Sequence, residues 1–176
     1  CPMNDGAAAM IVTTTERARD LKQTPAIIMG TTQGIATQGE MMTSLYRPVI
    51  SGLPESWYAA EELWHLSGVS PKDVDVVQFY DAFTPLIPMQ LEEYGFCERG
   101  EGAAYWEGGD RIRLGGELPC NTSGGHLSEA YIHGMNLITE AVRQIRGTST
   151  AQVDDVELSL VTGGLGVPTS AVLLRR

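Results

Sequence analysis

The sequence predicts a layered α/β domain built on a mixed β-sheet, and two observations lead to this prediction. Short apolar, β-branched runs alternate along the chain with segments whose apolar residues recur at helical spacing. The chain has 176 residues, of which 43 % are hydrophobic, so it is long and apolar enough to bury the core of one ordinary domain.

The first 50 residues predict two strands and one short helix. Residues 7–13 form an apolar, β-branched run that is typical of a strand. Thr14 or its neighbouring threonine can cap a short helix over residues 15–21. A Thr-Pro pair ends this helix, and residues 26–29 predict the next strand. The glycines and threonines of residues 30–50 predict an irregular loop.

The middle of the chain predicts a helix, a strand and a second helix. Apolar residues at helical spacing, with Gly68 after them, predict a helix over residues 55–67. The β-branched run at residues 74–80 predicts a strand that leads into a loop. Thr84 is a cap for the following helix, which we expect to end at Tyr94.

The last part predicts an exposed excursion, a helix and two strands. Residues 97–118 are rich in glycine and charge, so we expect them to be solvated, with a partner surface as the second interpretation. Residues 121–126 predict a turn, and the helix after it ends at Gly147. Strands over residues 156–162 and 170–174 follow, joined by a glycine-rich turn.

The charge of the chain excludes two classes of partner. Lysine and arginine number 12 and aspartate and glutamate 22, so the formal net charge is −10. Nucleic acids and anionic membranes are bound through basic surfaces, so we expect neither as a partner. No apolar run approaches the ~20 residues of a membrane helix, and no signal peptide is visible.

The three cysteines predict neither a disulfide framework nor a metal site. Cys1, Cys97 and Cys120 are odd in number and widely spaced, which is typical of a protein of the reducing cytoplasm. We expect the last two to be small buried fillers, because no basic neighbour would lower their pKa. Residues 1–6 lack an initiator Met and look like mid-chain sequence, so we expect a part of the protein to precede them.

Tyr80 and Asp81 stand where a predicted buried strand ends. Side chains at such strand ends often belong to the functional site of an open α/β sheet. A structural interpretation is also open, in which Tyr80 is half-buried at the sheet end and Asp81 caps the next turn. Residue spacing alone favours the structural interpretation.

Two glycine pairs lie beside predicted strand ends. Gly124 with Gly125, and Gly163 with Gly164, would let the backbone approach a ligand and turn N–H groups toward developing negative charge. Two tight turns are the simpler interpretation. Neither pair matches a dinucleotide or phosphate-loop motif.

Three ring side chains that can carry protons follow the first glycine pair. They are His126, Tyr131 and His133. The spacing of the two histidines is not a zinc pattern, and no set of carboxylates or thiols completes one. We therefore predict no metal.

Four segments, taken in order, resemble the thiolase superfamily. Each alone is a weak signal, but their order along nearly the whole chain is specific, and they match the C-terminal part of a thiolase. They are DGAAA at 5–9, YDAF at 80–83 in place of NEAF or HEAF, NTSGG at 121–125 with SEAYIHG at 128–134 in place of NPSGG and SxGHPxG, and VTGGLG at 161–166 in place of CxGG.

This resemblance implies a thiolase-like layered fold, a mixed sheet with helices on both faces. It also implies that residues 1–24 end the N-terminal thiolase-like domain and that residues 25–176 form the C-terminal one. Thiolases are dimers, so a homodimer is expected as well.

The departures from the thiolase motifs change the expected chemistry. Tyr80 replaces the Asn or His that opens NEAF or HEAF, Tyr131 replaces the histidine of GHP, and Val161 replaces the acid/base cysteine of CxGG. Claisen chemistry needs a thiol that takes up the acyl group and a second base that moves protons. Valine supplies neither function, so thiolysis is disfavoured.

The two tyrosines resemble those of thiolase-like lipid-transfer proteins that act as steroid side-chain aldolases. The resemblance implies retro-aldol cleavage of a β-hydroxyacyl-CoA, giving a ketosteroid and a short acyl-CoA of the propionyl-CoA type. A phenol, with a reference pKa of about 10, can share a proton with an alcohol or donate a hydrogen bond to an enolate. Two alternatives stay open: a sterol-carrier-type acyl-CoA thiolase, and a non-catalytic subunit that binds acyl-CoA or lipid.

The implied catalytic residues are Tyr80 and Tyr131, with base and acid unassigned. Asp81 would orient Tyr80, and His126 and His133 are secondary candidates. The substrate would lie against Gly124, Gly125, Gly163 and Gly164, the last two lending N–H groups to the enolate hole.

The resemblance also implies what the protein works with. The substrate is a steroid CoA thioester, and no further cofactor is expected. Aldolases of this kind need an OB-fold partner subunit, so we expect a dimer within a heteromeric complex.

Overall fold

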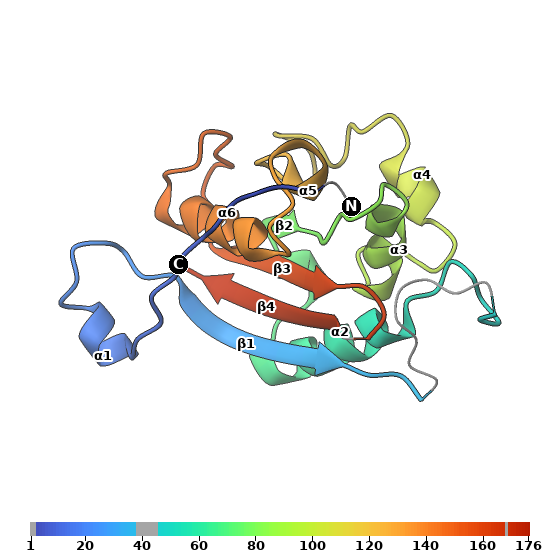
Figure 1. The fold of residues 1–176 in the computed structure, drawn as a ribbon, viewed down its shortest axis with the longest axis horizontal. Coiled ribbons are helices and arrows are strands. Elements are labelled where there is room, and N and C mark those ends of the chain that lie inside the picture. The colour runs from blue at the N-terminus through green and yellow to red at the C-terminus, as the bar shows by residue number, and fades with distance from the viewer. Residues whose placement is uncertain (1–2, 38–45, 168) are drawn as a thin grey trace.

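The structure, a computed structural model, describes residues 3–37, 46–167 and 169–176 (Figure 1). Within these residues, β1 (Ile27–Gly34), β2 (Val76–Gln78), β3 (Leu158–Gly164) and β4 (Thr169–Arg175) form one sheet in the order β1-β4-β3-β2. β4 pairs antiparallel with both β1 and β3, and β2 pairs parallel with β3. The predicted mixed sheet is confirmed.

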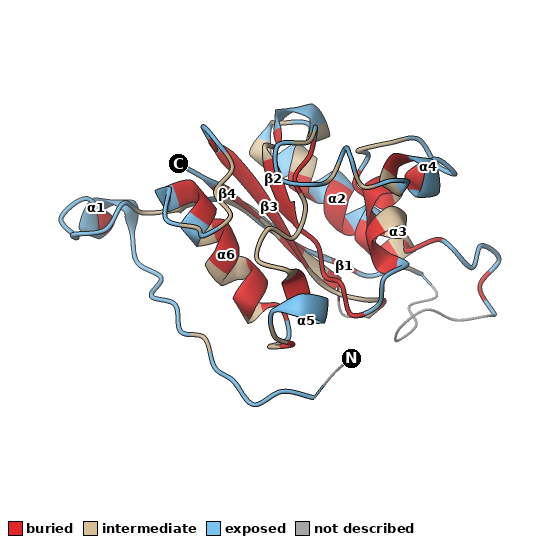
Figure 2. Ribbon diagram, turned by 90° about the horizontal axis from the view of Figure 1, so that it is seen from above, coloured by how far each residue is buried: buried red, intermediate tan, exposed pale blue. Residues whose placement is uncertain are grey.

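Helices cover both faces of this sheet, as predicted (Figure 2). α2 (Pro54–Ser67) packs on β1 and β4, and α6 (Met135–Arg146) packs on the opposite face over β2 and β3. The shorter helices are α1 (Thr15–Ala18), η1 (Pro71–Asp73), α3 (Leu86–Glu93), α4 (Gly102–Trp106) and α5 (Gly125–Ser128).

The alternation of side chains along β3 divides the core into two clusters. Leu160 belongs to the cluster beneath α2, together with Leu63. Its neighbour Val161 points the other way and belongs to the cluster beneath α6, with Leu137 and Ile145. Burying each leucine or isoleucine stabilises the fold by about 1.5–3 kcal/mol. The sheet is therefore held from both sides.

α6 has the sequence features of a helix that packs on a sheet. Leu137, Ala141 and Ile145 recur every four residues, so they share one face, and all three are buried. Gly147 ends the helix in the left-handed conformation, where its N–H bonds the carbonyls of the last turn. The arginines near this end suit the negative end of the helix dipole.

Residues 7–13 do not form the predicted strand. They pair with no strand within the part of the chain that the structure describes, and Ile11 is 92 % exposed. A β-branched run forms a strand only when a neighbouring strand satisfies its backbone groups. The predicted helix after it begins as expected, with Thr14 accepting from the Arg17 N–H, but α1 ends at Ala18. That residues 1–24 belong to a preceding domain stays a prediction.

The predicted loop 30–50 was wrong in its first part. β1 continues through Gly34, because β4 lies alongside it over its whole length. Residues 38–45 of that predicted loop lie outside the described residues. The same tertiary pairing extends β3 through Gly163 and Gly164, which were predicted to be a turn.

Residues 97–118 were also predicted wrongly, because they are not wholly exposed. They contain α4, and Tyr105 and Leu118 are each only 4 % exposed within the core beneath α2. The Arg111 guanidinium lies 3.6 Å from the centre of the Tyr105 ring and covers it. This segment therefore packs its apolar side chains in the core and turns charged side chains toward the solvent. Glu98 and Glu101 remain exposed.

No helix among the described residues is both long and apolar enough to cross a membrane.

The remaining predicted elements are observed with small shifts of their ends. β2 is shorter than predicted, and the predicted turn at 121–126 includes the start of α5.

Replacement of Gly34 by alanine tests the close approach of β1 to α2. A β-carbon on Gly34 would lie 1.7 Å from the carbonyl oxygen of Glu55, so strand and helix must separate. Overpacking of this kind costs about 1–3 kcal/mol or more. We expect the free energy of unfolding of Gly34→Ala, measured with urea on the intact protein, to fall by at least that amount.

Gly52→Ala is the matched control, because its added β-carbon meets nothing closer than 3.4 Å. An equal loss of stability in both variants, or none in either, would contradict the packing described for β1 and α2.

Candidate active site

The end of β2 is held in place by buried hydrogen bonds to the backbone of Tyr80. The Tyr80 N–H donates to the Thr162 hydroxyl over 2.8 Å, and the Gln90 amide donates to the Tyr80 carbonyl over 2.9 Å. Thr162 in turn donates to the Gln90 side-chain oxygen over 2.5 Å. Tyr80 is thus fixed on both sides of its α-carbon by β3 and α3.

Asn121 attaches the following loop to the same strand end. Its side chain accepts from the Phe79 N–H at 2.7 Å and donates to the Phe79 carbonyl at 3.0 Å, so it pairs with the backbone as a neighbouring strand would. Asn121 takes a positive φ of 48°, which asparagine tolerates better than most residues. The segment between Asn121 and α6 therefore begins beside Tyr80.

The structure brings the hydroxyls of Tyr80 and Tyr131 into direct contact. The two oxygens are 2.5 Å apart, although the residues are 51 positions apart in the sequence. Each tyrosine is only 8 % exposed. A short hydrogen bond with little solvent around it is a strong one, because competing water is excluded. The pair lies beneath α6, in the same cluster as Val161.

Asp81, His126 and Gly134 form a second hydrogen-bonded chain beside this pair. One Asp81 oxygen lies 2.8 Å from the His126 backbone nitrogen and 2.9 Å from its Nδ1. The Gly134 N–H donates to Nε2 of His126 over 2.8 Å. Asp81 and His126 are both buried, so these bonds join β2, α5 and the N-cap of α6.

The first glycine pair makes room for Asp81. A β-carbon on Gly125 would lie 2.2 Å from an Asp81 carboxylate oxygen, and Gly125 also has a positive φ of 62°. Gly124 has a φ of 99°, a conformation that side chains rarely adopt. The pair therefore has a packing reason of its own. Contact of these glycines with a substrate stays a prediction.

The surroundings shift the pKa of one tyrosine and of the aspartate. Burial, the hydrogen bond with Tyr80 and the nearby negative charge of Asp81 raise the pKa of Tyr131 well above that of a free phenol, so Tyr131 keeps its proton at neutral pH. Burial raises the pKa of Asp81, but its hydrogen bonds to His126 and Asn121 outweigh this and lower the pKa overall. Asp81 is therefore a carboxylate.

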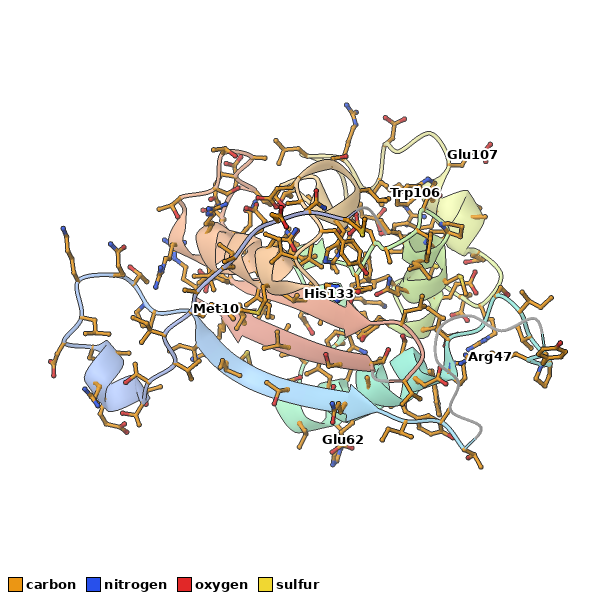
Figure 3. All side chains as sticks on the ribbon, in the orientation of Figure 1. Met10, Arg47, Glu62, Trp106, Glu107 and His133 are labelled. Carbon is orange, nitrogen blue, oxygen red and sulfur yellow. The ribbon has the colours of Figure 1, made fainter. Side chains whose placement is uncertain are left out.

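An open pocket of about 520 Å³ lies next to the tyrosine pair. His133, Gly134 and Gly163 line it, with residues of β1, β4 and the start of α6. His133 is exposed beside the first turn of α6 (Figure 3), and its ring centre is 5.0 Å from that of Tyr131. Val161 and Thr162 also line the pocket. Because Thr162 bonds Tyr80 and His133 packs on Tyr131, the pocket lies one residue away from each tyrosine.

The predicted site residues thus gather in one place. Tyr80, Asp81, His126, Tyr131 and His133 form a continuous group, and Gly163 lines the pocket beside them. Gly164 follows in β3 with a φ of 82°, paired with Thr169. Their catalytic roles stay predictions.

Sequence reasoning missed Thr162 and Gln90, which hold the Tyr80 backbone. Gln90 is an ordinary helix residue in the sequence, and Thr162 one of many strand threonines, so neither carried a signal.

Burial raises the pKa of Cys97 to about 11, with nearby Glu92 adding to the shift, and burial alone raises that of Cys120 to about 12. Among the described residues, no three histidine, cysteine, aspartate or glutamate side chains are placed to hold a metal ion.

Residues 34–175 match the family described as thiolase C-terminal domain-like. This match covers most of the chain and shows that the chain belongs to that family. The thiolase resemblance is therefore confirmed, as is the layered α/β fold.

The chain is similar to two curated lyases and to one solved structure. It is 52 % identical to a steroid side-chain-cleaving aldolase of Thermomonospora curvata, and the alignment covers 99 % of this chain and 44 % of that relative. It is 51 % identical to a 17-hydroxy-3-oxo-4-pregnene-20-carboxyl-CoA lyase of Mycobacterium tuberculosis, over 99 % of this chain and 45 % of that relative. It is 53 % identical to a chain of the Ltp2-ChsH2(DUF35) aldolase structure, with a TM-score of 0.87 over 92 % of this chain and 42 % of that one. This chain thus spans less than half the length of the relatives it matches.

The Asp81→Asn substitution tests the hydrogen bonds around the Asp81 carboxylate. The amide that replaces one carboxylate oxygen would face donors, so we expect the free energy of unfolding at pH 7 to fall by about 1–3 kcal/mol. Because the pKa of Asp81 is lowered in the fold, this stabilisation is present above the ordinary aspartate range and is lost as the pH falls through the lowered pKa.

Urea unfolding of the intact protein at pH 7 and at pH 3 measures both effects. The difference between the variant and the unchanged protein should shrink at the lower pH. Asp154→Asn, at an exposed position, is the control. A difference that is independent of pH would contradict the assignment of Asp81 as a stabilising carboxylate.

Proposed function

We propose that this chain carries the acid–base site of an aldolase, which cleaves the steroid side chain of a β-hydroxyacyl-CoA by a retro-aldol reaction. The products are a ketosteroid and a short acyl-CoA of the propionyl-CoA type. The observation that carries the proposal is the 2.5 Å contact between the hydroxyls of Tyr80 and Tyr131. The similarity to a steroid side-chain-cleaving aldolase and to a 17-hydroxy-3-oxo-4-pregnene-20-carboxyl-CoA lyase supports the same chemistry.

The side chain at position 161 disfavours the thiolase alternative. Val161 lines the pocket next to the tyrosine pair, where the thiolase motif carries an acid/base cysteine. Its isopropyl group holds no exchangeable proton. A retro-aldol reaction on a tertiary alcohol offers no ketone carbon to a thiol, so it needs no nucleophile. Position 161 therefore lacks the acid/base thiol of a thiolase, and the two phenols beside it can still move protons.

The reaction needs only proton transfers and one broken carbon–carbon bond. A base removes the proton of the β-hydroxyl, and the oxygen electrons form the ketone as the Cα–Cβ bond breaks. The electron pair of that bond moves to Cα and gives the thioester enolate. An acid then protonates Cα and releases the shortened acyl-CoA. No electrons are gained or lost overall, so no redox cofactor is involved.

Tyr80 and Tyr131 are proposed as one acid–base unit in these steps. Their hydroxyls share a hydrogen bond, so one phenol can take up the proton that the other gives away. Tyr131 keeps its proton at neutral pH because its pKa is raised, which suits a group that donates a hydrogen bond.

The remaining site residues are proposed to bind or orient. Gly163 lines the pocket and Gly164 follows it, so their N–H groups are proposed to stabilise the enolate. Gly124 and Gly125 are proposed to lie near the CoA thioester. His133 faces the same pocket and is proposed to contact the substrate.

The proposed enzyme works within a complex. The double name of the similar Ltp2-ChsH2(DUF35) aldolase supports a partner subunit. We propose that this partner is an OB-fold protein, that the thiolase-like chains form a dimer, and that the complex acts in the cytoplasm on a CoA thioester without a further cofactor.

Phenylalanine in place of either tyrosine tests the acid–base unit. Loss of one hydrogen-bond donor in an active site lowers kcat by about 10²–10³-fold. We expect Tyr80→Phe and Tyr131→Phe to show at least this loss when a steroid β-hydroxyacyl-CoA is incubated with the intact protein and its partner, and ketone release is followed.

Tyr58→Phe is the matched control, because Tyr58 is 45 % exposed on α2. Undiminished turnover in both test variants would refute the roles of the two phenols. Thiolysis of a β-ketoacyl-CoA would instead support the thiolase alternative. Tight binding of the β-hydroxyacyl-CoA without any product would support the carrier alternative.

Charge reversal at Glu98 and Glu101 tests whether the charged excursion faces the partner subunit. Both residues are exposed, and opposite charges at an interface rim steer association. We expect Glu98→Lys with Glu101→Lys to lower the yield of co-purified partner. The same reversal at the exposed Glu61 and Glu62 of α2 is the control. An unchanged yield would remove residues 98–101 from the interface.

A further inference from the structure

We infer that His126 is a positioning residue, which sets the contact between Tyr80 and Tyr131 and does not itself carry the protons of the reaction. The inference rests on the proposed function, in which those two phenols are the acid–base unit. It separates His126 from His133, with which the sequence grouped it.

The hydrogen bonds of His126 occupy both nitrogens of its ring. The Gly134 backbone nitrogen can only donate, so Nε2 of His126 must offer its lone pair to it across 2.8 Å. Nδ1 then carries the single ring proton and donates it to Asp81 across 2.9 Å. The ring is therefore neutral and held in one tautomer, with neither nitrogen left for a substrate.

The environment of His126 also keeps it from the substrate. The residue is 1 % exposed, whereas each of the two tyrosines keeps 8 % of its surface exposed. The titratable groups around its ring are Asp81, Tyr80 and Tyr131, all of them buried. A substrate could reach either ring nitrogen only by displacing Asp81 or the Gly134 N–H.

The ring lies against both phenols at once. Its centre is 4.7 Å from that of Tyr80 and 4.5 Å from that of Tyr131, whereas the two tyrosine ring centres are 6.1 Å apart. His126 thus supports both rings whose edges meet at the hydroxyl contact. A smaller or tilted side chain here would let the phenols move relative to each other.

Its hydrogen bonds tie together the segments that carry the two tyrosines. Asp81 follows Tyr80 at the end of β2, and Gly134 stands three residues after Tyr131 at the start of α6. The hydrogen bonds from Asp81 through His126 to Gly134 therefore fix the distance between the segments that carry the two phenols. A displacement of about 1 Å in a catalytic group can lower a rate about 10²-fold.

A double-mutant cycle tests whether His126 acts through the tyrosine pair. Phenylalanine at 126 keeps a flat ring between the two phenols but loses both hydrogen bonds. In the intact protein with its partner, we expect His126→Phe to lower kcat for aldol cleavage about 10- to 100-fold and to change KM less than threefold. Added to Tyr131→Phe, the same substitution should cause no further loss, because the contact it positions is already gone.

Several outcomes of the cycle would overturn the inference. Losses in the two variants that multiply would show that His126 acts independently of Tyr131. A loss in His126→Phe that appears mainly in KM would assign His126 to substrate binding. A changed shape of the pH profile in this variant would show that its ring carries a catalytic proton. His65→Asn, on the exposed face of α2, is the control for a histidine substitution as such.

A second measurement does not depend on activity. Nitrogen-15 NMR of the histidine-labelled intact protein at pH 8, with His126→Phe used to assign the signal, reports which ring nitrogen is protonated. We expect the proton on Nδ1 and the lone pair on Nε2. The opposite tautomer would overturn the inference. If the protein cleaves no β-hydroxyacyl-CoA at all, the proposed function fails, while this spectrum still decides whether the hydrogen-bonded chain exists.

Discussion

The site depends on one constraint, namely that two segments far apart in the sequence must be held side by side without a strand between them. The backbone of Asn121 bonds that of Val77 and its side-chain amide pairs with the backbone of Phe79. Asp81 adds bonds to the start of α5. These contacts are buried or half-buried, so each broken bond would leave a polar group without water, at a cost of about 1–3 kcal/mol. The contact between the two phenols is a consequence of this arrangement.

The sheet supplies the rigid base for that arrangement. Thr162 of β3 bonds the backbone of Tyr80 on one side, and Gln90 of α3 bonds it on the other. α6 presses the cluster that includes both tyrosines onto the same face of the sheet. A functional group placed on packed elements keeps its position better than one on a free loop. The two short distances in the site, between the phenols and between Asp81 and His126, therefore belong to the fold as a whole.

The chain also illustrates how a fold can keep its frame while the side chains of its site change. Residues 34–175 match the thiolase C-terminal domain-like family, while three side chains in or beside the pocket depart from the thiolase motifs. Val161 stands where thiolases carry a thiol. Tyr80 replaces an asparagine or a histidine, and Tyr131 replaces a histidine. Because a fold specifies where groups stand and not which groups they are, the function has to be argued from the site. The similar lyases carry names that agree with the chemistry of those phenols.

The sequence by itself determined the features that depend on neighbouring residues. Helical spacing located α2 and α6, and glycines marked their ends. Comparison with the thiolase motifs identified the replacements at Tyr80, Tyr131 and Val161. Only the tertiary structure decided that residues 7–13 pair with no strand among the described residues, that β3 runs on through its glycines, and that both ring nitrogens of His126 are hydrogen-bonded. The first two features depend on whether a partner strand lies alongside. The third depends on the hydrogen bonds of His126 to Asp81, 45 positions away, and to Gly134, and no local pattern records them.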